Sequence, residues 1–167
     1  MRINLCEIID MPGSAKPFSC RLETDRLGTS SISEFIVPPQ GEGVISNTAG
    51  ILTLSGRLTA RASCFCDRCG ESYEHEFDLP LEATLSAEAQ DEDNPDVFLL
   101  EGNELDLSDV LETLFILDMD TSFLCRADCA GLCSRCGKNL NEGPCSCEKE
   151  IDPRLAVLRQ LLDKGLD

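Results

Sequence analysis

The sequence lacks most of the features that mark membrane proteins, secreted proteins and enzymes. Its 167 residues include no apolar run long enough to cross a bilayer. The N-terminal segment carries Arg2, Glu7 and Asp10 and has no uninterrupted apolar core, so we expect no secretion signal and a cytoplasmic location. The one histidine, His75, stands between two glutamates, and a lone histidine in such a place is more often a surface residue than a general base. We therefore expect no catalysis, no membrane partner and no small-molecule substrate.

Basic residues are also scarce, and they are unevenly placed. The chain has 14 Lys and Arg against 31 Asp and Glu, a formal net charge of −17. This net charge lies entirely in residues 1–124, whereas residues 125–167 contain equal numbers of acids and bases. An acidic body repels phosphate, which argues against broad nucleic-acid binding and favours a basic protein partner. The plainer alternative is that the acidity only keeps the protein soluble.

Cysteine is the residue that the sequence has in excess. Six of the 11 cysteines fall within residues 124–147. In a reducing compartment such a cluster binds metal more often than it forms disulfides, and an odd total argues against complete pairing. One C-x-x-C-G sequence in the cluster has the form of a zinc knuckle, and two more cysteines follow after a short polar loop. The favoured ligands for one structural Zn²⁺ are Cys133, Cys136, Cys145 and Cys147.

A second C-x-x-C-G sequence, which begins with Cys66 and Cys69, leaves other ligand sets open. The two knuckles could share one metal ion as a zinc ribbon with a very long insertion, which would join Cys66 and Cys69 to the knuckle at residues 133–136. Alternatively, Cys125 or Cys129 could complete a second metal site beside Cys66 and Cys69. A site whose four ligands lie close together in the sequence costs less loop entropy, which favours the set in residues 133–147, although this cost grows slowly with loop length.

The chemistry of these ligands favours a structural role for the metal. A site made only of thiolates has no open coordination position, whereas a catalytic zinc keeps one. The two C-x-x-C motifs could also be redox-active, but neither lies in the strand-to-helix setting of thioredoxin-like enzymes. A thiol oxidoreductase or a nuclease is therefore the weaker alternative.

Alternation of apolar and polar residues predicts two long strands. Residues 51–62 and residues 76–85 each place their apolar side chains on one face. The knuckle of Cys66 and Cys69 lies between them, so we expect a long antiparallel hairpin with this knuckle at its tip. Pro80 falls on the polar face of the second strand and predicts an edge position or a bulge. Weaker candidates for short strands are residues 2–8, 33–37 and 43–47.

Helical periodicity occurs in two places. A helix near residues 107–118 should begin at Asp106 or Ser108, and residues 86–96 before it should form an acidic loop. The predicted apolar stripe of this helix is Leu107, Val110, Leu111, Leu114 and Leu117. A second helix should begin with Asp152 as its N-cap and Pro153 in its first turn.

Together these patterns predict an α+β fold. It has an N-terminal antiparallel β-sheet or half-closed barrel, one or two helices and a C-terminal zinc-knuckle segment. The predicted division is a β-rich domain over residues 1–120 and a cysteine-rich tail with the last helix over residues 121–167.

Three segments carry a resemblance to a known family. The first is Cys66-Asp67-Arg68-Cys69-Gly70, set between the two alternating strands. The second runs from Leu124 to Cys147 and includes Asn139-Leu140-Asn141, and the third is Asp152-Pro153-Arg154-Leu155. In this order and spacing they resemble the YceD family, whose members are described as large ribosomal RNA subunit accumulation proteins. Many relatives have lysine where Ala130 stands and proline where Ser134 stands.

The resemblance implies a non-enzymatic factor in large ribosomal subunit biogenesis, needed for the synthesis, processing or accumulation of large-subunit rRNA. Its partner would be a basic ribosomal protein or a pre-ribosomal particle. The residues available for a contact with rRNA are Arg57, Arg61 and Arg68 on and near the hairpin, and Arg126, Arg135 and Lys138 in the tail. The absent lysine at position 130 weakens such a contact. The residues alone also allow a zinc-ribbon adaptor that binds a protein unrelated to ribosomes.

Overall fold

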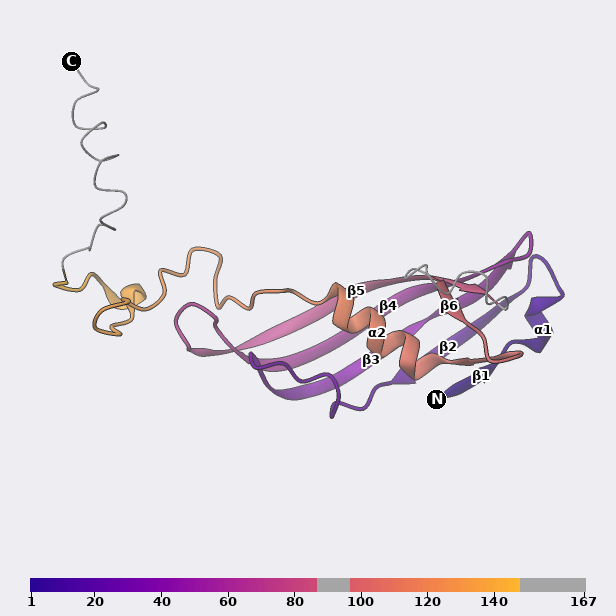
Figure 1. Cartoon of the computed structure of the whole chain (residues 1–167), viewed down its shortest axis with the longest axis horizontal. Coiled ribbons are helices and arrows are strands. Elements are labelled where there is room, and N and C mark those ends of the chain that lie inside the picture. Colours follow the sequence, from indigo (N-terminus) through magenta and orange to yellow (C-terminus); the bar gives the residue numbers. More distant parts are fainter. Residues whose placement is uncertain (87–96, 148–167) are drawn as a thin grey trace, which may run out of the picture.

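The structure is a computed structural model, and it describes residues 1–86 and 97–147. The predicted acidic loop from residue 87 onward and the predicted C-terminal helix lie outside the described residues. The elements are, in chain order (Figure 1), β1 (Arg2–Asn4), α1 (Cys6–Ile9), β2 (Ala15–Arg21), β3 (Ile32–Thr48), β4 (Ile51–Phe65), β5 (Ser72–Ser86), β6 (Val97–Leu99), β7 (Glu104–Asp106), α2 (Leu107–Asp118) and the 3₁₀ helix η2 (Leu140–Glu142).

The largest part of the described fold is one open five-stranded sheet. Its strand order is β2-β3-β4-β5-β6, with β2 and β6 at the two edges, and β1 and β7 form a separate two-stranded sheet. The pairs from β2 to β5 are antiparallel, whereas the short edge strand β6 runs parallel to β5. The predicted α+β class is confirmed as a mostly sheet protein with few helices among the described residues. The sheet is open rather than a closed barrel.

The β4–β5 hairpin is the longest feature that the sequence predicts, and the structure confirms it. Its register runs without interruption from Leu52 opposite Leu85 to Phe65 opposite Ser72. Both strands continue beyond the predicted bounds toward the hairpin tip. Strand β6 pairs only with the last three residues of β5, so Pro80 lies where that edge of β5 has no strand partner among the described residues. This placement agrees with the predicted edge position.

Three weaker strand predictions need correction. Residues 33–37 and 43–47 belong to one long strand, β3, because register shifts between Ile32 and Gln40 carry the strand past its proline pair. Residues 2–8 form a strand only up to Asn4, and the helical turn α1 follows. Strand β2 was not predicted, since only Phe18 and Cys20 give it an apolar face.

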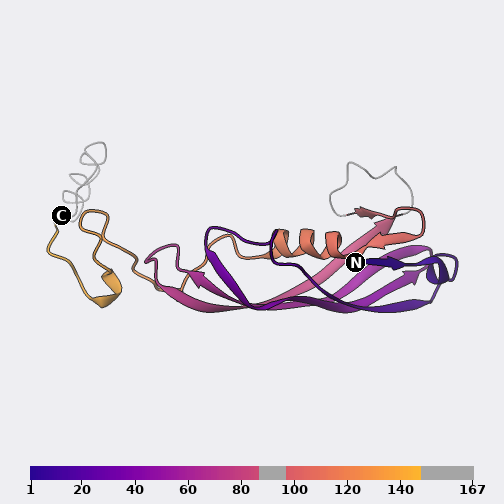
Figure 2. The same cartoon turned by 90° about the horizontal axis from the view of Figure 1, so that it is seen from below.

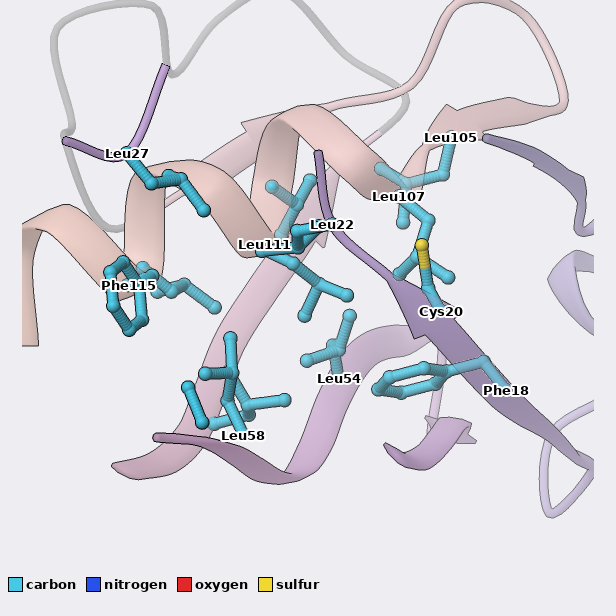
Figure 3. Packing of buried hydrophobic residues seen from close by; sticks show 14 of the residues in the cluster. Phe18, Cys20, Leu22, Leu27, Leu54, Leu58, Leu105, Leu107, Leu111 and Phe115 are labelled. Carbon is cyan, nitrogen blue, oxygen red and sulfur yellow. The ribbon is translucent and has the colours of Figure 1, made fainter. Parts of the chain in front are cut away.

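Helix α2 lies along one face of the sheet (Figure 2), and five of its side chains are buried. The Asp106 side chain caps it by accepting hydrogen bonds from the N–H groups of Ser108 and Asp109. The predicted stripe is correct as far as Leu114, but Leu117 is 67% exposed and Phe115 is fully buried in its place. The buried side chains of the helix belong to one core with those of the sheet: Leu107, Val110, Leu111, Leu114 and Phe115. Figure 3 shows Leu107, Leu111 and Phe115 of this helix near Leu54 and Leu58 of β4.

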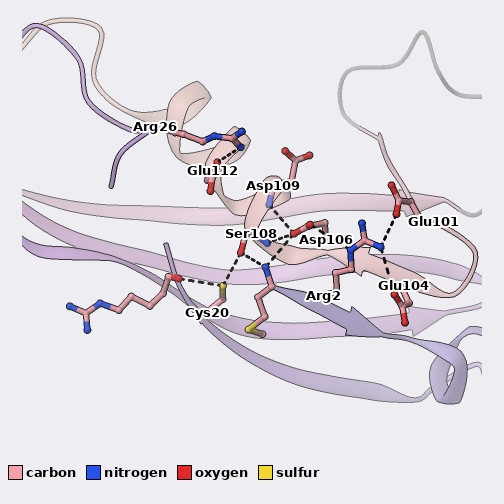
Figure 4. A network of polar contacts seen from close by, with 11 residues as sticks. Arg2, Cys20, Arg26, Glu101, Glu104, Asp106, Ser108, Asp109 and Glu112 are labelled. Carbon is pink, nitrogen blue, oxygen red and sulfur yellow. Dashed lines mark hydrogen bonds and ion pairs between the residues drawn. The ribbon is translucent and has the colours of Figure 1, made fainter. Parts of the chain in front are cut away.

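Polar contacts join the start of α2 to the N-terminal segment (Figure 4). The amine of Met1 donates to Ser108 Oγ at 2.6 Å, and Arg2 forms an ion pair with Glu101 at 3.1 Å. These contacts are exposed, so each contributes little to stability by itself. They fix the small β1–β7 sheet against the helix.

Two opposed glycines allow β3 and β4 to approach closely, which leads to a first prediction. A Cβ added at Gly56 would meet the carbonyl oxygen of Glu42 and would lie 2.8 Å from Gly43 Cα, both of them backbone atoms. We expect Gly56→Ala to lower the free energy of unfolding by about 1–3 kcal/mol, because the strands must separate. The measurement is urea denaturation. Gly28→Ala, where nothing lies within 4 Å of the new Cβ, is the matched control and should stay close to wild type.

Candidate metal centre

Four cysteines from two distant parts of the chain meet at the tip of the β4–β5 hairpin. We call Cys66, Cys69, Cys125 and Cys129 the hairpin tetrad. Their four sulfur atoms lie within 4.8 Å of one another. Cys66 Sγ is 3.7 Å from Cys129 Sγ, and Cys69 Sγ is 3.7 Å from Cys125 Sγ. Zinc–sulfur bonds of about 2.3 Å in a tetrahedron place sulfurs about 3.8 Å apart, so the tetrad has the size of a metal site.

The cysteines of the knuckle at residues 133–136 form a second group in the tail. We call Cys133, Cys136, Cys145 and Cys147 the tail tetrad. These four sulfur atoms also lie within 4.8 Å of one another, and Cys145 Sγ is 3.4 Å from Cys133 Sγ. Three members of the hairpin tetrad are buried, whereas the tail tetrad is half-buried and its Cys136 is exposed. The two sites therefore share a donor set and differ in their access to solvent.

The two C-x-x-C-G loops have the same backbone conformation. In the hairpin, the N–H of Gly70 donates to the carbonyl of Cys66 at 2.8 Å, and in the tail the N–H of Gly137 donates to the carbonyl of Cys133 at 2.9 Å. The φ angles of these glycines are 73° and 70°, a left-handed conformation that other residues rarely adopt. Each loop turns backbone N–H groups toward its sulfurs, which stabilises thiolates.

The tail reaches the hairpin tip through a set of hydrogen bonds to Asp67. The N–H of Phe123 donates to Asp67 Oδ2 at 2.7 Å, and the N–H of Asp67 donates to the Phe123 carbonyl at 2.8 Å. Ser31 Oγ donates to the other carboxylate oxygen at 2.6 Å. These bonds lower the pKa of Asp67, the Ser31 hydroxyl having the largest effect. Because the Phe123 ring is buried in the main core, the tail is fixed to the sheet just before Cys125.

Beyond Cys129 the tail contacts the hairpin loop at three further points. The N–H of Leu132 donates to the Arg68 carbonyl at 3.0 Å, and Arg68 Nη1 donates to the Cys129 carbonyl at 3.1 Å. Asn139 Nδ2 donates to Glu71 Oε1 at 2.9 Å. Figure 1 shows the tail passing the hairpin tip at the left end of the sheet. The two tetrads are therefore neighbours along one continuous structure.

The electrostatics of both tetrads suit a divalent cation. Burial alone would raise the pKa of Cys66, but hydrogen bonds from backbone N–H groups lower it to about 6. The pKa of Cys133 is also lowered to about 6, and the N–H of Cys136 contributes most to this shift. The pKa of Cys125 is raised to about 12 by burial and sulfur neighbours, and that of Cys147 to about 12 by the Cys136 thiol and burial. Four thiolates together need a positive charge between them, which a metal ion supplies. Either tetrad could hold one.

The structure brings together some of the cysteine sets that the sequence left open and not others. The favoured set forms the tail tetrad. The zinc-ribbon pairing of Cys66 and Cys69 with the knuckle at residues 133–136 is not formed. Cys125 and Cys129 both lie beside Cys66 and Cys69, whereas the alternative drawn from the sequence placed one or the other of them there.

The basic residues considered for rRNA contact have partners within the chain. Arg57 pairs with Asp78 at 2.9 Å and Arg61 with Glu74 at 3.9 Å on the outer face of the hairpin. Arg68 contacts the Cys129 carbonyl, Arg126 contacts Asn141 and Asp128, and Lys138 contacts the Pro144 carbonyl. Arg135 also has an interaction partner.

His75 is less exposed than its sequence neighbours suggest. Its side chain is 24% exposed, and its ring packs edge-on against Phe77 and Phe123 with centroids 4.6 Å and 5.5 Å apart. Its Nε2 lies 3.4 Å from an oxygen of Asp120. The histidine therefore belongs to the aromatic contacts that hold the start of the tail, and it is not a simple surface residue.

Sequence reasoning missed two residues that organise the tetrads, Asp67 and Asn141. Both lie inside segments that the sequence marks, but nothing in the local pattern shows what their side chains contact. Asn141 Nδ2 donates to Cys129 Sγ at 3.3 Å, and this hydrogen bond is the largest cause of the lowered pKa of Cys129.

Within the described part of the chain, no helix has the length and apolar character needed to cross a membrane.

The fold is an open sheet with one cysteine tetrad at its hairpin tip and a second in the tail. These features define a class of small proteins with two four-cysteine sites, each of the size that a metal ion needs. The family model described as "Large ribosomal RNA subunit accumulation protein YceD" matches residues 54–162, which include both tetrads. The chain belongs to the YceD family, as the sequence resemblance predicts.

Similarity to individual proteins is lower. The chain is 36% identical over 50 residues to the chloroplastic "Large ribosomal RNA subunit accumulation protein YCED homolog 1" of Arabidopsis thaliana, which is 30% of this chain and 16% of that protein. Uncharacterized proteins of Mycobacterium bovis and Mycobacterium tuberculosis are 28% identical over 128 residues, 74% of this chain and 61% of theirs. The chain thus spans less than two thirds of the length of these relatives. The comparison with solved structures found no match.

Proposed function

We propose that this protein is a non-enzymatic factor needed for the accumulation of large-subunit rRNA. Membership of the YceD family is the observation that carries the proposal. The protein would act in the synthesis, processing or stability of that rRNA by binding a basic ribosomal protein or a pre-ribosomal particle in the cytoplasm. The net charge of −17, located in residues 1–124, supports a basic protein partner more than direct binding of phosphate.

We further propose that each tetrad binds one structural Zn²⁺. The tail tetrad is the set that the sequence favours, and the hairpin tetrad has the same donors and similar sulfur spacing. Four thiolates complete a tetrahedral shell, so the ion would stabilise the fold and would not activate a substrate. In this proposal residues 1–120 form the β-rich domain and residues 121–167 the metal-binding tail, with Phe123 joining them.

The proposed function predicts a specific loss in cells. Depletion of the protein in its source organism should lower the ratio of large-subunit to small-subunit rRNA, because the factor serves only the large subunit. The measurement is quantitative RNA analysis together with sucrose-gradient profiles. A depleted strain with an unchanged ratio would contradict the proposal. Re-expression of the wild-type chain is the control and should restore the ratio.

A pull-down of tagged protein, with and without nuclease treatment, identifies the kind of partner. Large-subunit ribosomal proteins that remain bound after nuclease treatment would support a basic protein partner. Precursor rRNA whose removal also releases the ribosomal proteins would contradict that partner and indicate direct RNA binding. Recovery of an unrelated protein alone would favour the adaptor alternative.

A further inference from the structure

The segment Asn139-Leu140-Asn141 belongs to the loop of the tail tetrad by sequence, and it contacts the hairpin tetrad. Asn139 is the N-cap of η2 (Leu140–Glu142), and this short helix lies in the loop that separates the two halves of the tail tetrad. At the same time, Asn141 Nδ2 donates to Cys129 Sγ of the hairpin tetrad at 3.3 Å. A side chain that is carried by one site and touches a ligand of the other can transmit occupancy between them.

Two hydrogen bonds to its oxygen orient the Asn141 side chain. Its Oδ1 accepts from the N–H of Ala130 at 2.8 Å and from Arg126 Nη2 at 2.7 Å. Both donors lie in the segment that holds Cys125 and Cys129. With Oδ1 so occupied, the amide nitrogen must face the Cys129 sulfur, where it stabilises a thiolate.

The position of η2 depends on the tail loop in turn. Asn139 Oδ1 accepts from the N–H of Asn141 at 3.0 Å, and the N–H of Leu140 donates to the Gly131 carbonyl at 2.9 Å. The loop itself begins after Cys136 and ends at Cys145, both ligands of the tail tetrad. A metal ion that joins these two cysteines therefore closes the loop and limits where η2 can lie.

We propose that Asn141 is a positioning residue that couples the two metal sites. Metal binding at the tail tetrad holds η2 in place, and Asn141 then orients Cys129 for metal binding at the hairpin tetrad. By thermodynamic linkage the effect is reciprocal, so an occupied hairpin site strengthens binding in the tail by the same factor. The proposal rests on the zinc sites of the proposed function and does not depend on the ribosomal role.

The test compares zinc affinities of the full chain with those of variants that keep one tetrad. Metal-free protein in reducing buffer is titrated with Zn²⁺ against a chromophoric chelator of known affinity. Cys133→Ser/Cys136→Ser leaves only the hairpin site, and Cys66→Ser/Cys69→Ser leaves only the tail site. We expect the product of the two wild-type affinities to exceed the product of these single-site affinities by about 10–100-fold, the usual effect of a hydrogen bond to a ligand.

Asn141→Asp tests the residue itself. Aspartate keeps an oxygen for Ala130 and Arg126 but places an acceptor against Cys129 Sγ. The coupling factor, which is the product of the two affinities in the two-site chain divided by the product of the single-site affinities, should therefore fall to about one. Asn141→Ala checks that the loss does not depend on the added charge. Glu142→Gln, an exposed neighbour in η2, is the matched control and should behave as wild type.

The outcomes separate the coupling from the metal sites. Two zinc ions per wild-type chain, with an affinity product equal to that of the single-site variants, would overturn the coupling alone. Full coupling in Asn141→Asp would overturn the role of Asn141. A wild-type chain that binds no zinc would refute the metal sites, and the coupling with them, while leaving the ribosomal proposal standing.

Discussion

The Cys66→Ser/Cys69→Ser variant is expected to lose one of two zinc ions per chain and to detach residues 125–129 from the hairpin tip. Serine does not replace thiolate as a zinc ligand, so the hairpin tetrad loses half of its donors. A structural zinc ion contributes on the order of 10 kcal/mol to the folding of the segment that binds it. The metal at this site would join the hairpin tip to residues 125–129. The change should therefore expose the chain between residues 124 and 132 to protease, while the sheet and the tail tetrad stay folded.

Zinc content by elemental analysis and limited proteolysis with mass mapping measure this result. Cys6→Ser removes an exposed cysteine outside both tetrads and should leave zinc content and cleavage unchanged. Cys136→Ser should also lose one zinc ion but open only the knuckle after residue 130, because Phe123 and Asp67 still hold the start of the tail. Two zinc ions retained in the Cys66→Ser/Cys69→Ser variant would show that the hairpin tetrad is not a metal site.

The two tetrads differ in how far apart their cysteines lie in the sequence, and this difference explains why the sequence predicts the tail tetrad more clearly than the hairpin tetrad. The ligands of the tail tetrad lie close together along the chain, so their spacing alone suggests the set. The hairpin tetrad forms only because the chain leaves α2 and crosses the hairpin tip, where Asp67 binds Phe123. That crossing is a tertiary contact between distant segments. Local patterns therefore left Cys125 and Cys129 as alternatives and gave no role to Asn141.

The same distinction applies to the fold. Strands β4 and β5 have one buried and one exposed face over many residues, so alternation identifies them and their hairpin. Strand β3 is interrupted by irregular register near its proline pair, and its two halves look separate in the sequence. Strand β2 has too few inward apolar residues to stand out. These parts are held by pairing with strands that are themselves predictable, and their own sequence contributes little signal.

Helix α2 provides the last prediction, because the sequence named Leu117 as its final buried residue and the structure buries Phe115 instead. Phe115 is fully buried and lies with its ring centroid 5.2 Å from that of Phe77 and 6.1 Å from that of Phe35. We expect Phe115→Ala to lower the free energy of unfolding by about 3–5 kcal/mol, since it removes a large side chain from a core that can only partly close around the cavity. Chemical denaturation monitored by circular dichroism measures the change.

Leu117→Ala is the matched control for this result. Leu117 is two residues away on the same helix and is 67% exposed, so its replacement should change stability by no more than about 0.5 kcal/mol. A large loss with Leu117→Ala and a small loss with Phe115→Ala would mean that the helix packs with the stripe suggested by sequence. The opposite result fixes the rotation of α2 on the sheet. Because the tail leaves from the end of this helix, that rotation also sets the path by which Phe123 and Cys125 reach the hairpin tip.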